Sequence, residues 1–222
     1  MTQGFVYKKV EIPQPAGHNR GMIQLGSLRW RPLLAGIAVF FLLISARAQS
    51  VDIFMSVGAA PAAMGTNPQP APTLAGDSTD AQYPKWIKIG SAQMGVGRGV
   101  SISNGSVATS NPSVSEVVVT KMTDSTTPSL YTLVCGGTAA VSQPIPYVTI
   151  DFRNTNNSQV FYRLQMQNVY FTGVSSSSGG SVPSESLSLF FTKVSWSYVT
   201  FDNSKVGTTI TKGWDVAKNA AF

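Results

Sequence analysis

The acidic residues are the first candidates for chemistry in this 222-residue chain, because it contains only one His and one Cys. His18 lies ahead of the region with folding patterns, which excludes a histidine-based catalytic triad there. The single Cys135 excludes an intramolecular disulfide and a CxxC zinc site. Two carboxylates could still meet in space, as they do in glycosidases. The acids from residue 49 onward are Asp52, Asp77, Asp80, Glu116, Asp124, Asp151, Glu185, Asp202 and Asp215.

Most of these acids lie in sequences typical of turns. Asp124 in Thr-Asp-Ser and Asp202 in Phe-Asp-Asn are placed to accept hydrogen bonds from their own backbone. The Asp77-Ser-Thr-Asp80 segment has too few ligands for a calcium loop, and Glu185 has no base beside its flanking serines. We therefore expect no enzyme, no metal site and no cofactor.

The glycine cluster Gly95-Val-Gly-Arg-Gly99 could suggest a nucleotide-binding loop. Its GxGxG spacing lacks the third interval of a dinucleotide fingerprint, and no helical pattern follows it. The cluster therefore predicts backbone flexibility at a turn or a β-bulge.

The positive charge is concentrated at the N-terminus. The chain has a formal net charge of +6, but residues 1–48 contain six Lys or Arg against Glu11 alone. Residues 49–222 are nearly neutral, with ten basic and nine acidic residues. Without a basic stripe in the folded region, we expect no nucleic-acid partner.

Residues 1–48 have the pattern of a signal peptide or an N-terminal anchor. Arg29 and Arg31 precede the 13-residue apolar run Leu33–Ser45, and Ala46-Arg-Ala48 follows as a cleavage site. A membrane-spanning helix needs about 20 apolar residues, so cleavage after Ala48 is favoured, with an uncleaved anchor as the alternative. A start at Met22 would give a leader of ordinary length. Membrane contact is expected only through this leader.

The remaining chain, residues 49–222, is dominated by patterns of β-strands. Alternating or β-branched stretches separated by turn residues predict a compact two-sheet β-barrel or sandwich with one short side helix. The predicted strands are Val51–Val57, Trp86–Ile89, Ser115–Thr123, Tyr147–Phe152, Val160–Gln167, Leu187–Tyr198 and Gly213–Val216. In the strand 187–198, aromatic residues on both faces indicate cover by a second copy or by a helix.

One helix and one long loop complete this interpretation. Thr127 as N-cap and Pro128 in the first turn predict a helix that ends at Gly136-Gly137, with Cys135 beside its packed face. The Pro- and Ala-rich segment 58–84 cannot hold a strand ladder and predicts a long exposed loop.

Several motifs together resemble the Hcp family (hemolysin-coregulated protein) of bacterial type VI secretion systems. The resemblance covers residues 51–222 in order. Its motifs here are Gly76–Asp80 with Trp86-Ile87, Gly95–Ser101, Pro112–Lys121 with Asp124 and Pro128–Leu130, Ser178–Leu189 with Phe191–Lys193, and Gly213–Asn219. The chain departs from the family pattern at Met94 (usually Trp), at Tyr83 (usually His), in extra residues over about 58–73, and in its leader.

The resemblance implies a barrel that assembles into a homohexameric ring. Such rings stack into a tube that a contractile sheath expels, with small effector proteins in the lumen. The implied partners are therefore other copies of this chain, sheath, spike and effectors. Two polar loops are candidates for contacts between subunits. Their residues are Gly76, Asp77, Ser78, Thr79 and Asp80 in one loop, and Ser178, Gly179, Gly180, Pro183 and Ser184 in the other.

Two alternatives remain open. The leader predicts a secreted or periplasmic protein, so an exported Hcp-like scaffold or binding module is one of them; cytoplasmic assembly is expected if the leader is not used. A secreted sandwich that binds carbohydrate through Trp86 or Trp214 is the other.

Overall fold

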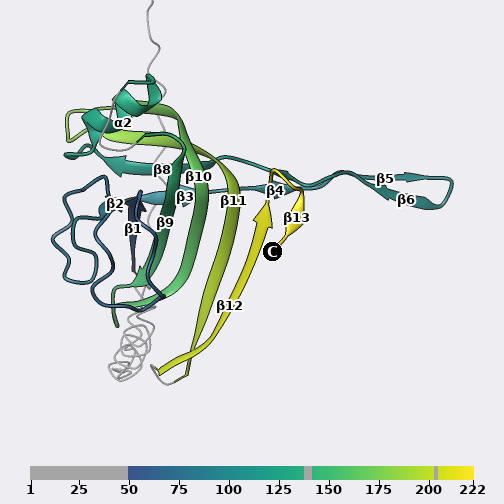
Figure 1. Cartoon of the computed structure of the whole chain (residues 1–222), viewed down its shortest axis with the longest axis horizontal. Helices are drawn as coiled ribbons and strands as arrows, with labels where there is room; N and C mark the ends of the chain where they lie inside the picture. The colour runs from purple at the N-terminus through teal and green to yellow at the C-terminus, as the bar shows by residue number, and fades with distance from the viewer. Residues whose placement is uncertain (1–49, 138–141, 203–204) are drawn as a thin grey trace, which may run out of the picture. The chain divides into compact units, whose positions relative to one another are not determined.

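The computed structural model describes residues 50–137, 142–202 and 205–222, within a compact unit that spans residues 48–222 (Figure 1). The predicted leader lies outside the described residues. Within the described ranges, no helix is both long and apolar enough to cross a bilayer. The elements are β1 (Val51–Val57), β2 (Ile87–Ile89), β3 (Ser91–Gln93), β4 (Val96–Gly97), β5 (Val100–Ser103), β6 (Ser106–Thr109), β7 (Ser113–Val114), β8 (Val117–Met122), α2 (Thr127–Val134), β9 (Ile145–Asn154), β10 (Gln159–Ser177), β11 (Ser184–Asp202), β12 (Lys205–Asp215) and β13 (Ala220–Ala221).

The strands form an antiparallel sheet that returns on itself. β1 pairs with β2 and β9, and the ladder continues through β10 to β11. The first part of β11 pairs with β8, which pairs with β3. β2 and β3 are consecutive and meet at Gly90, whose backbone N–H donates to the carbonyl of Thr120 at 2.7 Å, so the barrel closes there. The predicted all-β class with one short helix is confirmed for the described residues, in which a nine-stranded sheet contains the barrel strands and two further sheets have two strands each.

The long strand β11 changes neighbours along its length. Its first half, from Ser184 to Leu189, pairs with β8, whereas from Lys193 onward it pairs with β12. β12 therefore extends the sheet beyond the barrel, and β13 pairs only with Trp214 and Asp215 at its end. The rest of β12 keeps one edge without a partner strand among the described residues.

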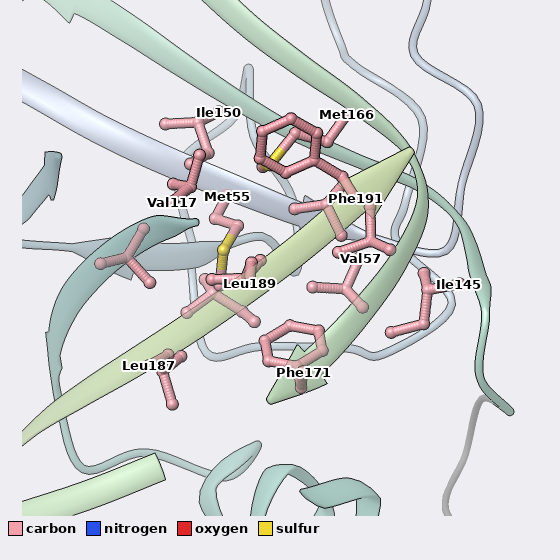
Figure 2. Close-up of a cluster of buried hydrophobic side chains, with 14 of the residues drawn as sticks. Met55, Val57, Val117, Ile145, Ile150, Met166, Phe171, Leu187, Leu189 and Phe191 are labelled. Atoms are coloured by element: carbon pink, nitrogen blue, oxygen red, sulfur yellow. The ribbon is translucent and has the colours of Figure 1, made fainter. Parts of the chain in front are cut away.

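The main core fills the barrel with side chains from every wall strand (Figure 2). Period-2 alternation brings one apolar set inward on each strand, and each fully buried side chain contributes about 1.5–3 kcal/mol. The labelled core residues are Met55, Val57, Val117, Ile145, Ile150, Met166, Phe171, Leu187, Leu189 and Phe191.

The segment 58–84 contains no helix or strand, as predicted, but it is not exposed throughout. Leu74 and Tyr83 are buried, and Phe54 stacks on Tyr83 with ring centroids 4.4 Å apart. Trp86 Nε1 donates to the carbonyl of Pro70 at 2.9 Å. The expectation of an exposed loop is therefore only partly correct, because this segment also supplies apolar cover for Phe54 on the outer face of β1.

The helix α2 begins one residue earlier than predicted, with Thr126 at the N-cap. Thr127 is instead the first helical residue, and its hydroxyl accepts a hydrogen bond from the backbone of Asp124. Leu130 and Leu133 pack inward, and Gly136, at φ +76°, follows the last turn. Cys135 is exposed rather than packed, because it lies about 200° around the helix axis from Leu133.

Candidate self-association surface

A two-stranded ribbon leaves the barrel between β3 and β8. It starts with the short β4–β7 pair and ends in the β5–β6 hairpin, which projects away from the other strands (Figure 1). In the hairpin, Val100 lies opposite Thr109 and Ile102 opposite Val107, so these side chains share one face. Val100, Ile102 and Val107 are 63%, 74% and 65% exposed. The ribbon therefore presents an apolar face that no described residue covers.

The sequence predicted a turn or a β-bulge at Gly95–Gly99, but these residues lie on one arm of the ribbon, with β4 at Val96–Gly97, and the hairpin beyond them was missed. The missed signal is Asn104-Gly105, which connects two alternating stretches and has positive φ at both residues, 48° and 79°. Asn-Gly is the preferred sequence of a two-residue hairpin turn. At the root of the ribbon, Arg98 Nε donates to the carbonyl of Ser110 at 2.8 Å.

The first predicted contact segment, Gly76–Asp80, lies along the rim of a cleft. Gly76 itself is buried, and a Cβ there would lie 2.7 Å from the carbonyl oxygen of Trp86. Asp77 is exposed, and hydrogen bonds from Ser125 lower the pKa of its carboxyl. Thr79 is exposed, whereas Ser78 and Asp80 are half-buried. Asp80 accepts hydrogen bonds from the backbone of Gln82 and Tyr83, the turn role expected for such an acid.

The second predicted segment contributes one residue to the same cleft. Ser184 lines it together with Asp77–Asp80 and the end of β8, around a volume of about 630 Å³. The Ser178–Gly180 stretch is exposed at the β10–β11 connection and does not line this cleft. Pro183 is half-buried, and its carbonyl accepts from the backbone of Thr123 at 2.9 Å. Ser184 therefore lines the same cleft as the first segment, whereas Ser178–Gly180 does not.

Behind this cleft a buried lysine connects β8, β11 and the start of α2. Lys121 Nζ lies 2.7 Å from Glu185 Oε2 and 2.9 Å from Asp124 Oδ1, and it donates to the hydroxyl of Thr127. Burial raises the pKa of Glu185, but the hydrogen bond and charge of Lys121 outweigh burial and bring it below its usual value. Glu185 and Asp124 therefore have a structural role as ion-pair partners of Lys121. The described residues contain no cluster of metal-ligating side chains.

This ion pair predicts loss of stability in acid. Because the folded-state pKa of Glu185 is depressed, its contribution is complete above the ordinary value of 4.5 and disappears as the pH falls through the folded value. We expect the urea midpoint to fall between about pH 5 and pH 3. Glu185→Gln should make this fall shallower, without abolishing it, because the pKa values of Asp52 and Asp80 are also lowered. Identical pH slopes for the two proteins would contradict the assignment.

A second buried ion pair fastens the 58–84 segment to the barrel. Arg163 binds Asp151 through both carboxylate oxygens, at 2.6 and 2.7 Å, and also donates to the carbonyl of Ala62. The Tyr83 hydroxyl donates to Asp151, and burial together with this carboxylate raises the pKa of Tyr83. Strand alternation places Arg163 on the face of β10 opposite the core residues Leu164 and Met166. It is buried because the segment covers that face.

The strands β10 and β11 carry exposed aromatic residues. Phe190 and Tyr198 on β11 are 45% and 50% exposed, and Tyr170 on β10 contacts Phe190 with ring centroids 6.4 Å apart. No described helix covers these three rings, which keeps them available to another copy. Trp86 is only 1% exposed, so it cannot form a carbohydrate-binding surface.

Solved structures of secretion proteins have the same fold. One described as a type six secretion system protein has a TM-score of 0.65 and 23% identity, covering 78% of this chain and 100% of its own. Hcp1 from Salmonella typhimurium has a TM-score of 0.59 and 20% identity over 78% of this chain and 99% of its own. A type VI secretion system effector from Yersinia pestis has a TM-score of 0.54 and 18% identity, covering 74% of this chain and 100% of its own.

The family comparison is more specific than these similarities of fold. No curated protein gave a significant match to the sequence. The family model described as "Type VI secretion system effector, Hcp" matches residues 64–198, more than half of the chain. This match includes the ribbon and both predicted contact segments. The chain therefore belongs to the Hcp family of type VI secretion systems.

Proposed function

We propose that this protein is a structural subunit of the type VI secretion tube. Its copies form hexameric rings that stack, and the lumen carries small effectors. It works by binding copies of itself and not by catalysis. Sheath and spike proteins are its further partners in this role.

The observation that supports this proposal most strongly is the exposed β5–β6 hairpin at the end of the ribbon. A two-stranded hairpin is marginally stable in water on its own, and this one exposes three apolar side chains on one face. The barrel core is complete without it. Such a face is consistent with an interaction surface, and a second copy of the chain is the partner that a tube requires.

Sedimentation equilibrium tests the assembly step. The purified protein should have about six times the mass of its monomer, because a heterologous contact that closes on itself gives a cyclic assembly. The monomer mass is measured on the same sample by mass spectrometry, which also shows where the mature chain begins. A monomer at every concentration, with the fold intact by circular dichroism, would contradict the proposal.

The predicted leader supports a second candidate role, an exported Hcp-like scaffold or binding module. The apolar run Leu33–Ser45 before Ala46-Arg-Ala48 is the observation in its favour. In this role the chain is cleaved after Ala48 and acts in the periplasm or outside the cell. Cell fractionation with N-terminal sequencing separates the two roles: an intact leader on cytoplasmic protein excludes export by this route.

A further inference from the structure

The cleft beside Asp77 has more negative than positive charge. We name it the acidic cleft: it is formed by Asp77–Asp80, the end of β8, Ser184 and the adjoining parts of β1, β2 and β9. Its carboxylates are Asp52, Asp77, Asp80 and Asp124, with Glu185 directly behind them. The cations Lys88, Lys121 and Arg153 are shared among these five acids, and Lys85 acts on Asp77 from nearby. The acids therefore outnumber the cations.

Arg153 positions two of the carboxylates that line this cleft. It is only 7% exposed, yet it lines the cleft and binds Asp52 and Asp80 at 3.0 and 2.8 Å. Its Nε has no hydrogen-bond partner among the described residues. One guanidinium thus orders two carboxylates at the cleft wall. Met122, which also lines the cleft, is 52% exposed and offers an apolar contact next to these charges.

A second hollow has the complementary charge. We name it the tryptophan groove: Trp196 of β11 and Trp214 of β12 line it with the base of the ribbon, around a volume of about 440 Å³. One cation lines it, and two more lie next to its lining residues in the ladder or in the sequence. Arg98 lines the groove, Lys212 lies opposite Trp196 in the β11–β12 ladder, and Lys218 precedes the lining residue Asn219.

None of these three cations forms an ion pair with a described residue, and Lys212 and Lys218 are exposed. The groove has lining residues in β4, β11 and β12, whereas the acidic cleft has lining residues in β2 and β8; β4 lies apart from β2 and β8 in Figure 1. One copy therefore presents two separate surfaces of opposite charge.

We propose that the acidic cleft of one copy binds the cationic rim of the tryptophan groove of the next copy. This inference rests on the proposed function and specifies which surfaces meet within the ring. A contact between two unlike surfaces is head-to-tail, and such contacts close into a ring when the rotation between copies permits. The charges orient the approaching subunits, while Met122 and the two tryptophans supply the apolar part of the contact.

Charge reversal tests this contact. One variant carries Lys212→Glu with Lys218→Glu, and the other carries Asp77→Lys with Thr79→Lys. All four positions are exposed, and the loss at Asp77 is limited to its hydrogen bonds from Ser125, so the changes should leave the monomer folded. Each variant is expressed as the full chain, and its mass is measured by sedimentation equilibrium. Each alone should lose the ring and sediment about sixfold lighter, because like charges then face each other.

Mixing the two variants at equal concentration should restore the ring, because reversed surfaces of the two variants attract each other. Asn156→Glu, in the exposed turn between β9 and β10, is the control and should keep the ring. The inference is wrong if either variant alone remains a full ring, or if the mixture stays monomeric. A monomeric unaltered protein would instead contradict the proposed function itself.

Discussion

Replacing Arg163 by Leu is expected to lower the free energy of unfolding by about 3–5 kcal/mol. The change leaves the carboxylate of Asp151 fully buried without its guanidinium partner, and only the Tyr83 hydroxyl remains to bind it. It also removes the hydrogen bond to Ala62 that fastens the 58–84 segment. Because domains are stable by about 5–15 kcal/mol, this is a large part of the total. Urea denaturation followed by tryptophan fluorescence measures it.

The matched control replaces both members of the pair. Arg163→Leu with Asp151→Leu removes the two buried charges together, and such replacements by apolar residues are often close to neutral. The double variant should therefore recover much of the stability lost in the single one. A single variant as stable as the unaltered protein would mean that Arg163 and Asp151 are not buried as a pair.

Replacing Ile102 by Asp is expected to abolish assembly while leaving the monomer stable. Ile102 is 74% exposed at the centre of the apolar face of the ribbon, so the barrel core does not depend on it. The free energy of unfolding of the monomer should change by less than about 0.5 kcal/mol. In the assembly, a buried carboxylate without a partner would cost several kcal/mol at every contact. Light scattering after size-exclusion chromatography should show the monomer mass.

Ser103→Asp provides the control for this variant. Ser103 is the next residue along β5 and lies on the opposite, polar face of the same hairpin. It introduces the same charge at nearly the same place and should keep the assembly. Assembly of both variants would show that the apolar face is not a contact, and loss of assembly in both would point to a general effect of charge on the ribbon.

Strands of the barrel wall could be predicted from the sequence because the alternation of apolar and polar residues in each strand reflects which of its side chains are buried. The alternation in Val51–Val57 and the β-branched stretch that became β8 follow directly from one face turned to the core. The burial of Arg163 could not be predicted in this way, because it depends on a distant segment that covers its face. Asp151 and Arg163 do lie at equal distances from the Asn-rich turn near residue 157, which is a pairing signal.

The contact surface was predicted less completely. Asp77 and Thr79 could be chosen because polar, glycine-containing loops are exposed, but Gly76 in the same loop is buried by close packing against Trp86. The ribbon was missed because its strands are only two to four residues long, so the apolar side of β5 is too short to stand out. Patterns within one chain also do not specify which surfaces of two copies meet.

Electron microscopy of the purified mature protein tests the central claim, self-association through β-rich surfaces, most directly. We expect annular particles of six subunits at low concentration and stacked rings as the concentration rises. The ribbon should lie between neighbouring copies in the averaged images. Isolated, unassembled particles under every condition, from a protein with native circular dichroism, would contradict it.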